Sequence, residues 1–228
     1  MISGLLLSQA DDLIDRDGHR QASLHFSKFE TSLYSEYGLT DRLTLVLRLA
    51  GRQVSQDNNG ITDTASGLAA SRLGLQLQVF ETGRWIVAGQ ISAVVPGGGE
   101  NVADRPLGDG ANGIEMRALV GRSVRRRGFL DLQIGHTWRS EDYPSETRFD
   151  ATLGWRLSDR YSVMAQSFLT SGAADRRRNN RSFVQHKVQV SAGRQFRRGE
   201  LMVGAFTTVY GRNSIAESGF VMSWWRRF

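Results

Sequence analysis

The chain consists of segments of about ten residues in which large apolar side chains alternate with polar ones. In Thr147–Leu157, the odd-numbered residues from Phe149 to Leu157 are apolar, and the even-numbered residues from Arg148 to Arg156 are polar or glycine. A period of two predicts β-strands with one apolar face. Twelve segments fit this pattern, so the predicted fold is all-β. They are Ile2–Gln9, Ser23–Gly38, Leu43–Val54, Leu68–Phe80, Trp85–Val95, Gly113–Val124, Phe129–Trp138, Thr147–Leu157, Tyr161–Ser171, Ser182–Arg194, Leu201–Tyr210 and Ser214–Phe228.

The connections between these segments alternate between tight turns and longer polar stretches. The tight turns lie at residues 40–42, 81–84, 125–128, 158–160 and 196–200. The longer stretches are residues 10–22, 55–67, 96–112, 139–146 and 172–181, with a short one near 211–213. Short turns at one end and longer loops at the other are typical of an outer-membrane β-barrel. We therefore predict a single closed antiparallel transmembrane barrel of about twelve strands, with both termini at the short-turn end.

Length and composition agree with one barrel domain over residues 1–228. No interdomain linker is apparent, and no stretch approaches the roughly 18 consecutive apolar residues of a membrane helix. The segment Met1–Leu7 has no basic start and soon meets Asp11 and Asp12, so we expect a strand there and no signal peptide.

Alternation alone does not say which face of the strands points inward. A barrel of twelve strands has a wide lumen, which apolar side chains would have to fill in a soluble protein. Aromatic residues near the strand ends also predict interfacial girdles. We therefore expect the apolar face to meet outer-membrane lipid and lipopolysaccharide, with short turns in the periplasm and longer loops outside the cell. The girdle candidates are Tyr37, Phe80, Trp85, Phe129, Tyr161, Phe196 and Phe228 by the tight turns, and Phe26, Trp138, Phe168, Phe183 and Tyr210 towards the longer loops.

The last strand ends in an aromatic residue, Phe228, with Trp224 and Phe220 on the same predicted face. This ending resembles the closing strand of bacterial outer-membrane β-barrels, although Arg226 departs from the usual aromatic. The resemblance implies that Phe228, Trp224 and Phe220 form an assembly signal read by the barrel-assembly machinery.

A hairpin sequence supports the same localisation. Tyr34–Leu45 is an aromatic strand that ends in a Gly-Leu-Thr-Asp turn, and it resembles a recurrent hairpin of a group of outer-membrane transporters. Members of that group are found near aromatic-degradation or exopolysaccharide genes. The resemblance implies transport of a small-molecule solute.

The polar face of the predicted strands carries charges of both signs. They predict a polar lumen in which arginines line a narrow path for a small anionic, polyhydroxylated or aromatic solute. The alternative is that the same charges plug a structural barrel that serves an exopolysaccharide or secretion system. The candidate lumen residues are Arg48, Arg72, Glu115, Arg117, Asp131, Arg148, Asp150, Arg156 and Lys187.

Other functions find less support in the sequence. A barrel esterase or phospholipase needs a serine and histidine in a short motif, and in Gly135–Ser140 the serine stands at the wrong spacing from His136. We therefore expect no enzyme and no catalytic residue. The histidines lack metal-ligand spacing, so no metal or other cofactor is expected. The net charge of +6 comes from arginines that are scattered along the chain, and the run Arg176–Arg181 lies between strands, so no nucleic-acid partner is expected.

Overall fold

The computed structural model describes residues 1–58, 61–98, 111–125, 127–140, 143–174 and 182–226, and these form a β-barrel. The strands are β1 (Ile2–Ile14), β2 (Arg20–Gly38), β3 (Leu43–Asn58), β4 (Ile61–Leu68), β5 (Ser71–Thr82), β6 (Trp85–Val95), β7 (Gly113–Val124), β8 (Gly128–Arg139), β9 (Glu146–Arg156), β10 (Tyr161–Gly172), β11 (Phe183–Phe196), β12 (Gly199–Arg212), β13 (Ser214–Ile215) and β14 (Ser218–Trp225). None of the described residues forms a helix that could span a membrane.

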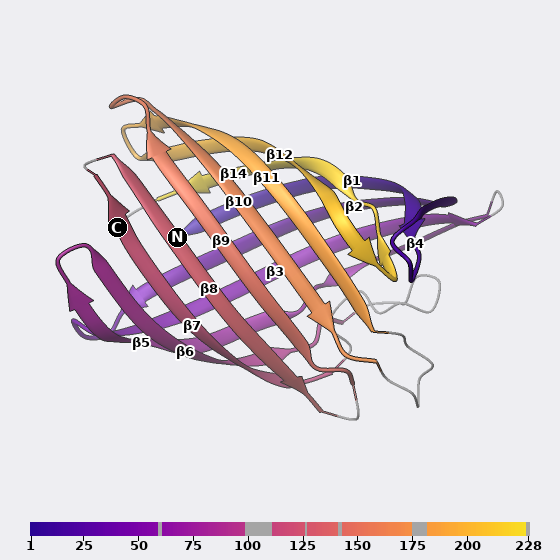
Figure 1. Cartoon of the computed structure of the whole chain (residues 1–228), viewed down its shortest axis with the longest axis horizontal. Helices are drawn as coiled ribbons and strands as arrows, with labels where there is room; N and C mark the ends of the chain where they lie inside the picture. Colours follow the sequence, from indigo (N-terminus) through magenta and orange to yellow (C-terminus); the bar gives the residue numbers. More distant parts are fainter. Residues whose placement is uncertain (59–60, 99–110, 126, 141–142, 175–181, 227–228) are drawn as a thin grey trace.

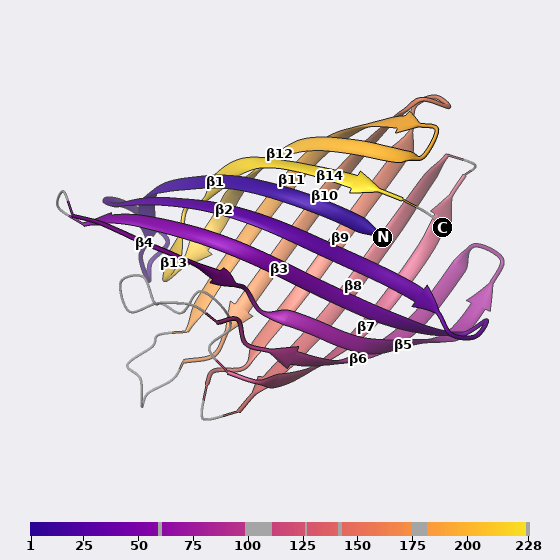
Figure 2. The same ribbon diagram turned by 180° about the vertical axis from the view of Figure 1, so that it is seen from behind.

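The barrel is closed because β1 pairs with both β2 and β14. Every neighbouring pair is antiparallel, and the strands run steeply tilted around the barrel (Figures 1 and 2). Full closure leaves the barrel wall without a free sheet edge, as a membrane-spanning sheet requires. The predicted twelve-stranded antiparallel barrel is confirmed, with two of its strands each divided in two.

Both divisions interrupt a predicted strand where the register shifts. Residues 43–48 of β3 pair with β5, and residues 51–58 pair with β4. Ala69 and Ala70 stand between β4 and β5. Ala69 keeps the ladder by donating its N–H to the carbonyl of Ala50 at 2.8 Å. The closing strand is interrupted at Ala216 and Glu217, between β13 and β14, and there the extra residue lies on β1, where residues 10–12 stand opposite these two. A bulge shifts the alternation by one residue, so Leu68 and Leu73, on either side of Ala69 and Ala70, both face outward.

Two stretches predicted as loops are mostly strand. Residues 10–22 extend β1 to Ile14 and begin β2 at Arg20, and residues 55–67 extend β3 and form β4. The prediction was wrong here because both hairpins continue beyond the barrel wall, as Figure 2 shows for β1 to β4, and their mostly polar sequences hide the alternation of a strand.

The turn between β1 and β2 is stabilised by Asp15. The backbone N–H of His19 donates to Asp15 Oδ1 at 2.9 Å, and the N–H of Asp17 donates to the same oxygen at 2.9 Å. These bonds, that of His19 first, hold the pKa of the Asp15 carboxyl below its usual value.

The outward face of the wall is apolar and the inward face is polar. Outward side chains such as Val190 and Phe220 are 66% and 68% exposed, whereas Glu115 on the inner face is 2% exposed. A continuous exposed apolar belt is what lipid contact requires. The predicted assignment of faces is therefore confirmed.

Some of the predicted girdle aromatics lie on the inner face instead. Phe129 lies over Gly154, and Phe183 lies over Gly172, so a side chain at either glycine would collide with the ring. Phe26 packs against Val54 and Ala65. Phe168 is the register partner of Lys187 and shares its inner face. The prediction for these four was wrong because it used distance from the strand ends and not the parity of each strand.

Both chain ends lie at the short-turn end of the barrel, as predicted (Figure 1). The amino group of Met1 donates to the carbonyl of Arg226 at 2.9 Å. Phe220 and Trp224 lie on β14, but Phe228 lies outside the described residues.

Candidate functional site

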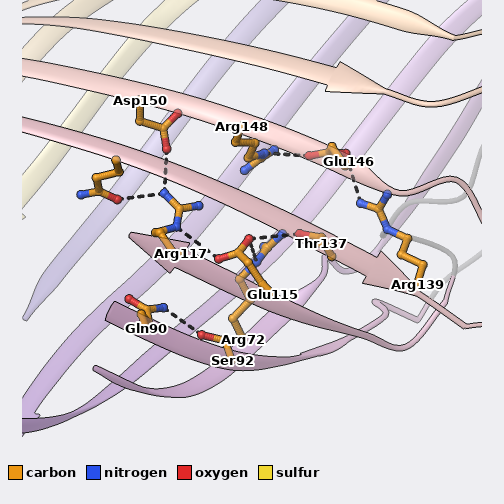
Figure 3. Close-up of polar contacts among 11 residues, drawn as sticks. Arg72, Gln90, Ser92, Glu115, Arg117, Thr137, Arg139, Glu146, Arg148 and Asp150 are labelled. Carbon is orange, nitrogen blue, oxygen red and sulfur yellow. Dashed lines mark hydrogen bonds and ion pairs between the residues drawn. The ribbon is translucent and has the colours of Figure 1, made fainter. Parts of the chain in front are cut away.

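Arg117 on β7 connects three strands of the inner wall. Its Nη1 donates to Asp150 Oδ2 on β9 at 2.9 Å and to Gln133 Oε1 on β8 at 2.8 Å. Its Nε lies 3.3 Å from Glu115 Oε1. The residue opposite Arg117 in the β7–β8 ladder is Gly135, which leaves room for the guanidinium to cross that strand towards β9. Figure 3 shows this bridge.

Glu115 is shared between two arginines. Arg72 on β5 donates from Nε to Glu115 Oε2 at 3.3 Å, and the hydroxyl of Thr137 donates to the same oxygen at 3.3 Å. Glu115 and Thr137 are each 2% exposed. A buried carboxylate with this many donors is fully hydrogen-bonded, which offsets the cost of its burial.

A second ion-pair chain lies towards the longer loops. Glu146 accepts from Arg148 Nε at 2.7 Å and from Arg139 Nη2 at 3.1 Å. Arg148 comes two residues before Asp150 on the inner face of β9, so this chain continues the Arg117 bridge, as Figure 3 shows.

Arg48 on β3 differs from these arginines. Its register partner on β5 is Arg72, and its electrostatic neighbours are Arg72, Arg148, Glu30 and Arg117. Glu30 is engaged by Arg52, whose Nε and Nη2 lie 2.9 Å and 2.7 Å from Glu30 Oε2. Arg48 makes no hydrogen bond or ion pair with any residue that the structure describes. It is therefore a half-buried cation beside three others. We call Arg48, Arg72, Arg117 and Arg148 the arginine quartet.

Neutral polar residues line the wall beside the quartet. Gln189 on β11 donates to Gln166 Oε1 on β10 at 2.9 Å, and Gln166 donates to Thr152 on β9 at 3.3 Å. Thr152 follows Asp150 on the inner face of β9, one step towards the short-turn end. This amide ladder can exchange hydrogen bonds with hydroxylated molecules.

Lys187 lies in a separate cluster at the seam of the barrel. It forms an ion pair with Glu217, which also lies 2.5 Å from Lys28 Nζ and accepts a short hydrogen bond from Ser8. Glu217 lies between β13 and β14, so the cluster joins β1, β2 and β11 to the closing strand.

Arg156 lies at the short-turn end, in a cavity of about 730 Å³. The cavity is also lined by Tyr34, Glu36, Arg197 and Glu200. Tyr34 is the register partner of Arg48, so the cavity reaches from the short-turn mouth to the edge of the quartet.

The structure brings together seven of the nine predicted lumen residues and places Arg156 and Lys187 in other clusters. The seven are Arg48, Arg72, Glu115, Arg117, Asp131, Arg148 and Asp150, where Asp131 joins through Gln133, which donates to it at 2.7 Å. Sequence reasoning missed Glu146 and Arg139, which lay in a predicted loop, and Glu217 and Lys28. Strand parity could have found Lys28, which is two residues from Glu30.

His136, weighed as part of an esterase motif, lies on the outer face. Its Nδ1 lies 2.8 Å from the hydroxyl of Thr147, and its ring packs edge-on against Trp138 at 4.5 Å between centroids. The hydrogen-bonding partner of His136 is thus Thr147 and not Ser140.

Solved structures resemble the chain over its whole length. An outer membrane channel from Pseudomonas putida F1 matches all of this chain and 94% of its own, with a TM-score of 0.75 and 18% identity. The NanC porin matches all of both chains, with a TM-score of 0.61 and 7% identity. The KdgM porin matches all of this chain and 98% of its own, with a TM-score of 0.55 and 8% identity. The fold is that of a bacterial outer-membrane barrel.

The prediction of that fold and membrane is confirmed. No protein-family model matches the sequence, and no curated protein matches it either. Identities this low describe the fold alone, so function has to come from the residues of the lumen.

Proposed function

We propose that the protein is an outer-membrane channel whose narrow polar lumen passes a small anionic solute. The observation that carries this proposal is the surplus positive charge of the arginine quartet. Arg72, Arg117 and Arg148 each have a carboxylate partner, whereas Arg48 has none among the described residues. Fixed positive charge in a narrow lumen raises the local concentration of anions.

The cavity at the short-turn end supports passage of a solute. It is open to water, reaches Tyr34 beside Arg48, and is lined by Arg156, Arg197 and Arg198 as well as by carboxylates. A solute that leaves the quartet would next meet the amide ladder and then this cavity, because Arg148, Thr152 and Arg156 follow one another in this order along the inner face of β9.

The similar structures support a channel more than an enzyme, because they are channels and porins. The KdgM porin has also been solved in complex with disordered oligogalacturonate, a carboxylated saccharide. A polyhydroxylated anion would suit a lumen that combines arginines with glutamine and threonine side chains.

A single-channel recording in a planar lipid bilayer tests this proposal. With a potassium chloride gradient across the bilayer, the wild-type barrel is expected to conduct, and the sign of the reversal potential should show preference for chloride. Arg16→Gln is a matched control, because Arg16 is an exposed arginine at the tip of the β1–β2 hairpin. That variant should conduct as the wild type does.

A plugged structural barrel is the second candidate, and a separate observation favours it. Glu115 and Glu217 are 2% and 4% exposed, and each is held by two cations. Such networks can fill a lumen and join its walls. A wild-type barrel that is folded and inserted but passes no current would favour this plugged form and reject the channel.

A further inference from the structure

Arg48, which is unpaired among the residues that the structure describes, has the features of a binding site for an oxyanion. Its guanidinium carries five N–H donors in a planar fork, which matches the two oxygens of a carboxylate or phosphate. No acceptor from the described residues satisfies these donors, and none of them is among the buried side-chain atoms without a partner, so they are exposed in the lumen. The fork thus has its donors available to a molecule in the lumen.

The surroundings of Arg48 keep it unpaired. Glu30, its acidic electrostatic neighbour, is bound by Arg52, and Glu115 is shared by Arg72 and Arg117. The nearby carboxylates are therefore already engaged by other arginines. An incoming oxyanion would reduce the repulsion between Arg48 and the rest of the quartet as well as satisfy the fork.

We infer that the arginine quartet binds the carboxylate or phosphate of a hydroxylated solute, with Arg48 as the bidentate donor. The amide ladder of Gln166, Gln189 and Thr152 lies on the same inner wall as Arg148 and would receive the hydroxyl groups. This inference rests on the proposed channel, because only a lumen that admits solutes lets the oxyanion reach Arg48. The inference goes further than the proposed channel, because it requires the bidentate hydrogen bonds of a guanidinium and not positive charge alone.

The test is interruption of the chloride current by galacturonate, with galactose as the matched neutral sugar and inorganic phosphate as the second oxyanion. Galacturonate should interrupt the wild-type current at millimolar concentration, and galactose should not. Interruption by phosphate but not by galacturonate would restrict the site to phosphate groups. No interruption by either oxyanion in a conducting barrel would overturn the inference.

Two variants of Arg48 distinguish the hydrogen-bonding geometry of the guanidinium from its positive charge. Arg48→Lys keeps the positive charge but loses the fork, so it should keep the preference for chloride and bind galacturonate roughly tenfold or more weakly, as expected for a lost charge-assisted hydrogen bond. Arg48→Gln should lose both the preference for chloride and the binding of galacturonate.

The outcomes distinguish this inference from the proposed function. If galacturonate interrupted the current of wild type and of Arg48→Lys equally, bidentate binding by the Arg48 guanidinium would be overturned. The proposed anion channel would be unaffected. A wild-type barrel without any current would reject the channel, and the inference with it.

Discussion

Replacing Arg117 with glutamine should destabilise the barrel by about 3 kcal/mol, whereas the same change at Arg48 should alter the free energy of unfolding by less than about 1 kcal/mol. Arg117 bridges Glu115, Asp150 and Gln133 at 3.3 Å, 2.9 Å and 2.8 Å, and its side chain is 11% exposed. Breaking a buried ion pair costs about 3–5 kcal/mol, because it leaves a charge without its partner.

The lower end of that range is expected for two reasons. Glu115 keeps Arg72 and Thr137 as donors after the change, and Asp150 is 21% exposed, so water takes over part of the lost interaction. Arg48 has no hydrogen-bond or ion-pair partner among the described residues, and its removal relieves repulsion from the three neighbouring arginines.

Urea unfolding in lipid vesicles, followed by tryptophan fluorescence, measures both changes on one scale. The protein has five tryptophans, and neither substitution alters them. If Arg48→Gln destabilised the barrel as much as Arg117→Gln, Arg48 would have a strong partner, and the argument from its unpaired charge would be refuted.

Three further predictions concern assembly, the seam and the orientation. Deleting Phe228 should leave unfolded chain in the periplasm if the terminal strand is the assembly signal; normal amounts of heat-modifiable folded barrel would contradict this. Glu217→Gln should lower stability by about 3 kcal/mol in the same urea assay, because Lys28 and Lys187 lose their shared carboxylate; an unchanged midpoint would show that the seam cluster contributes little. A cysteine at position 16, in a chain that has no other cysteine, should react with an impermeant maleimide on intact cells; reaction only after the outer membrane is broken would reverse the orientation.

Much of the fold could be predicted from the sequence because a strand repeats every two residues. Once Phe149 and Leu153 are assigned to the lipid face, Arg148 and Asp150 must face inward, and the structure places them there. The prediction failed where that period is interrupted. A bulge adds one residue at Ala69–Ala70, and another adds one on β1 opposite Ala216–Glu217, and nothing in the local composition marks either.

The pairing inside the lumen could not be predicted. Arg117 reaches Asp150 two strands away because Gly135 leaves space between them, and that space depends on the register of β7, β8 and β9. Glu146 was assigned to a loop because the polar stretch before it hides the start of β9. The lack of a described partner for Arg48 likewise depends on the pairing of the carboxylates, because Glu30 binds Arg52 and Glu115 binds Arg72 and Arg117.

We attribute the preference of the lumen for anions to the charge of Arg48, which no described residue neutralises. The most direct test is the reversal potential of Arg48→Glu, compared with wild type and with Arg16→Glu, in a potassium chloride gradient. Arg48→Glu should change the preference from chloride to potassium, while Arg16→Glu should behave as the wild type does. A reversal potential that stays at the wild-type value in Arg48→Glu would contradict this attribution.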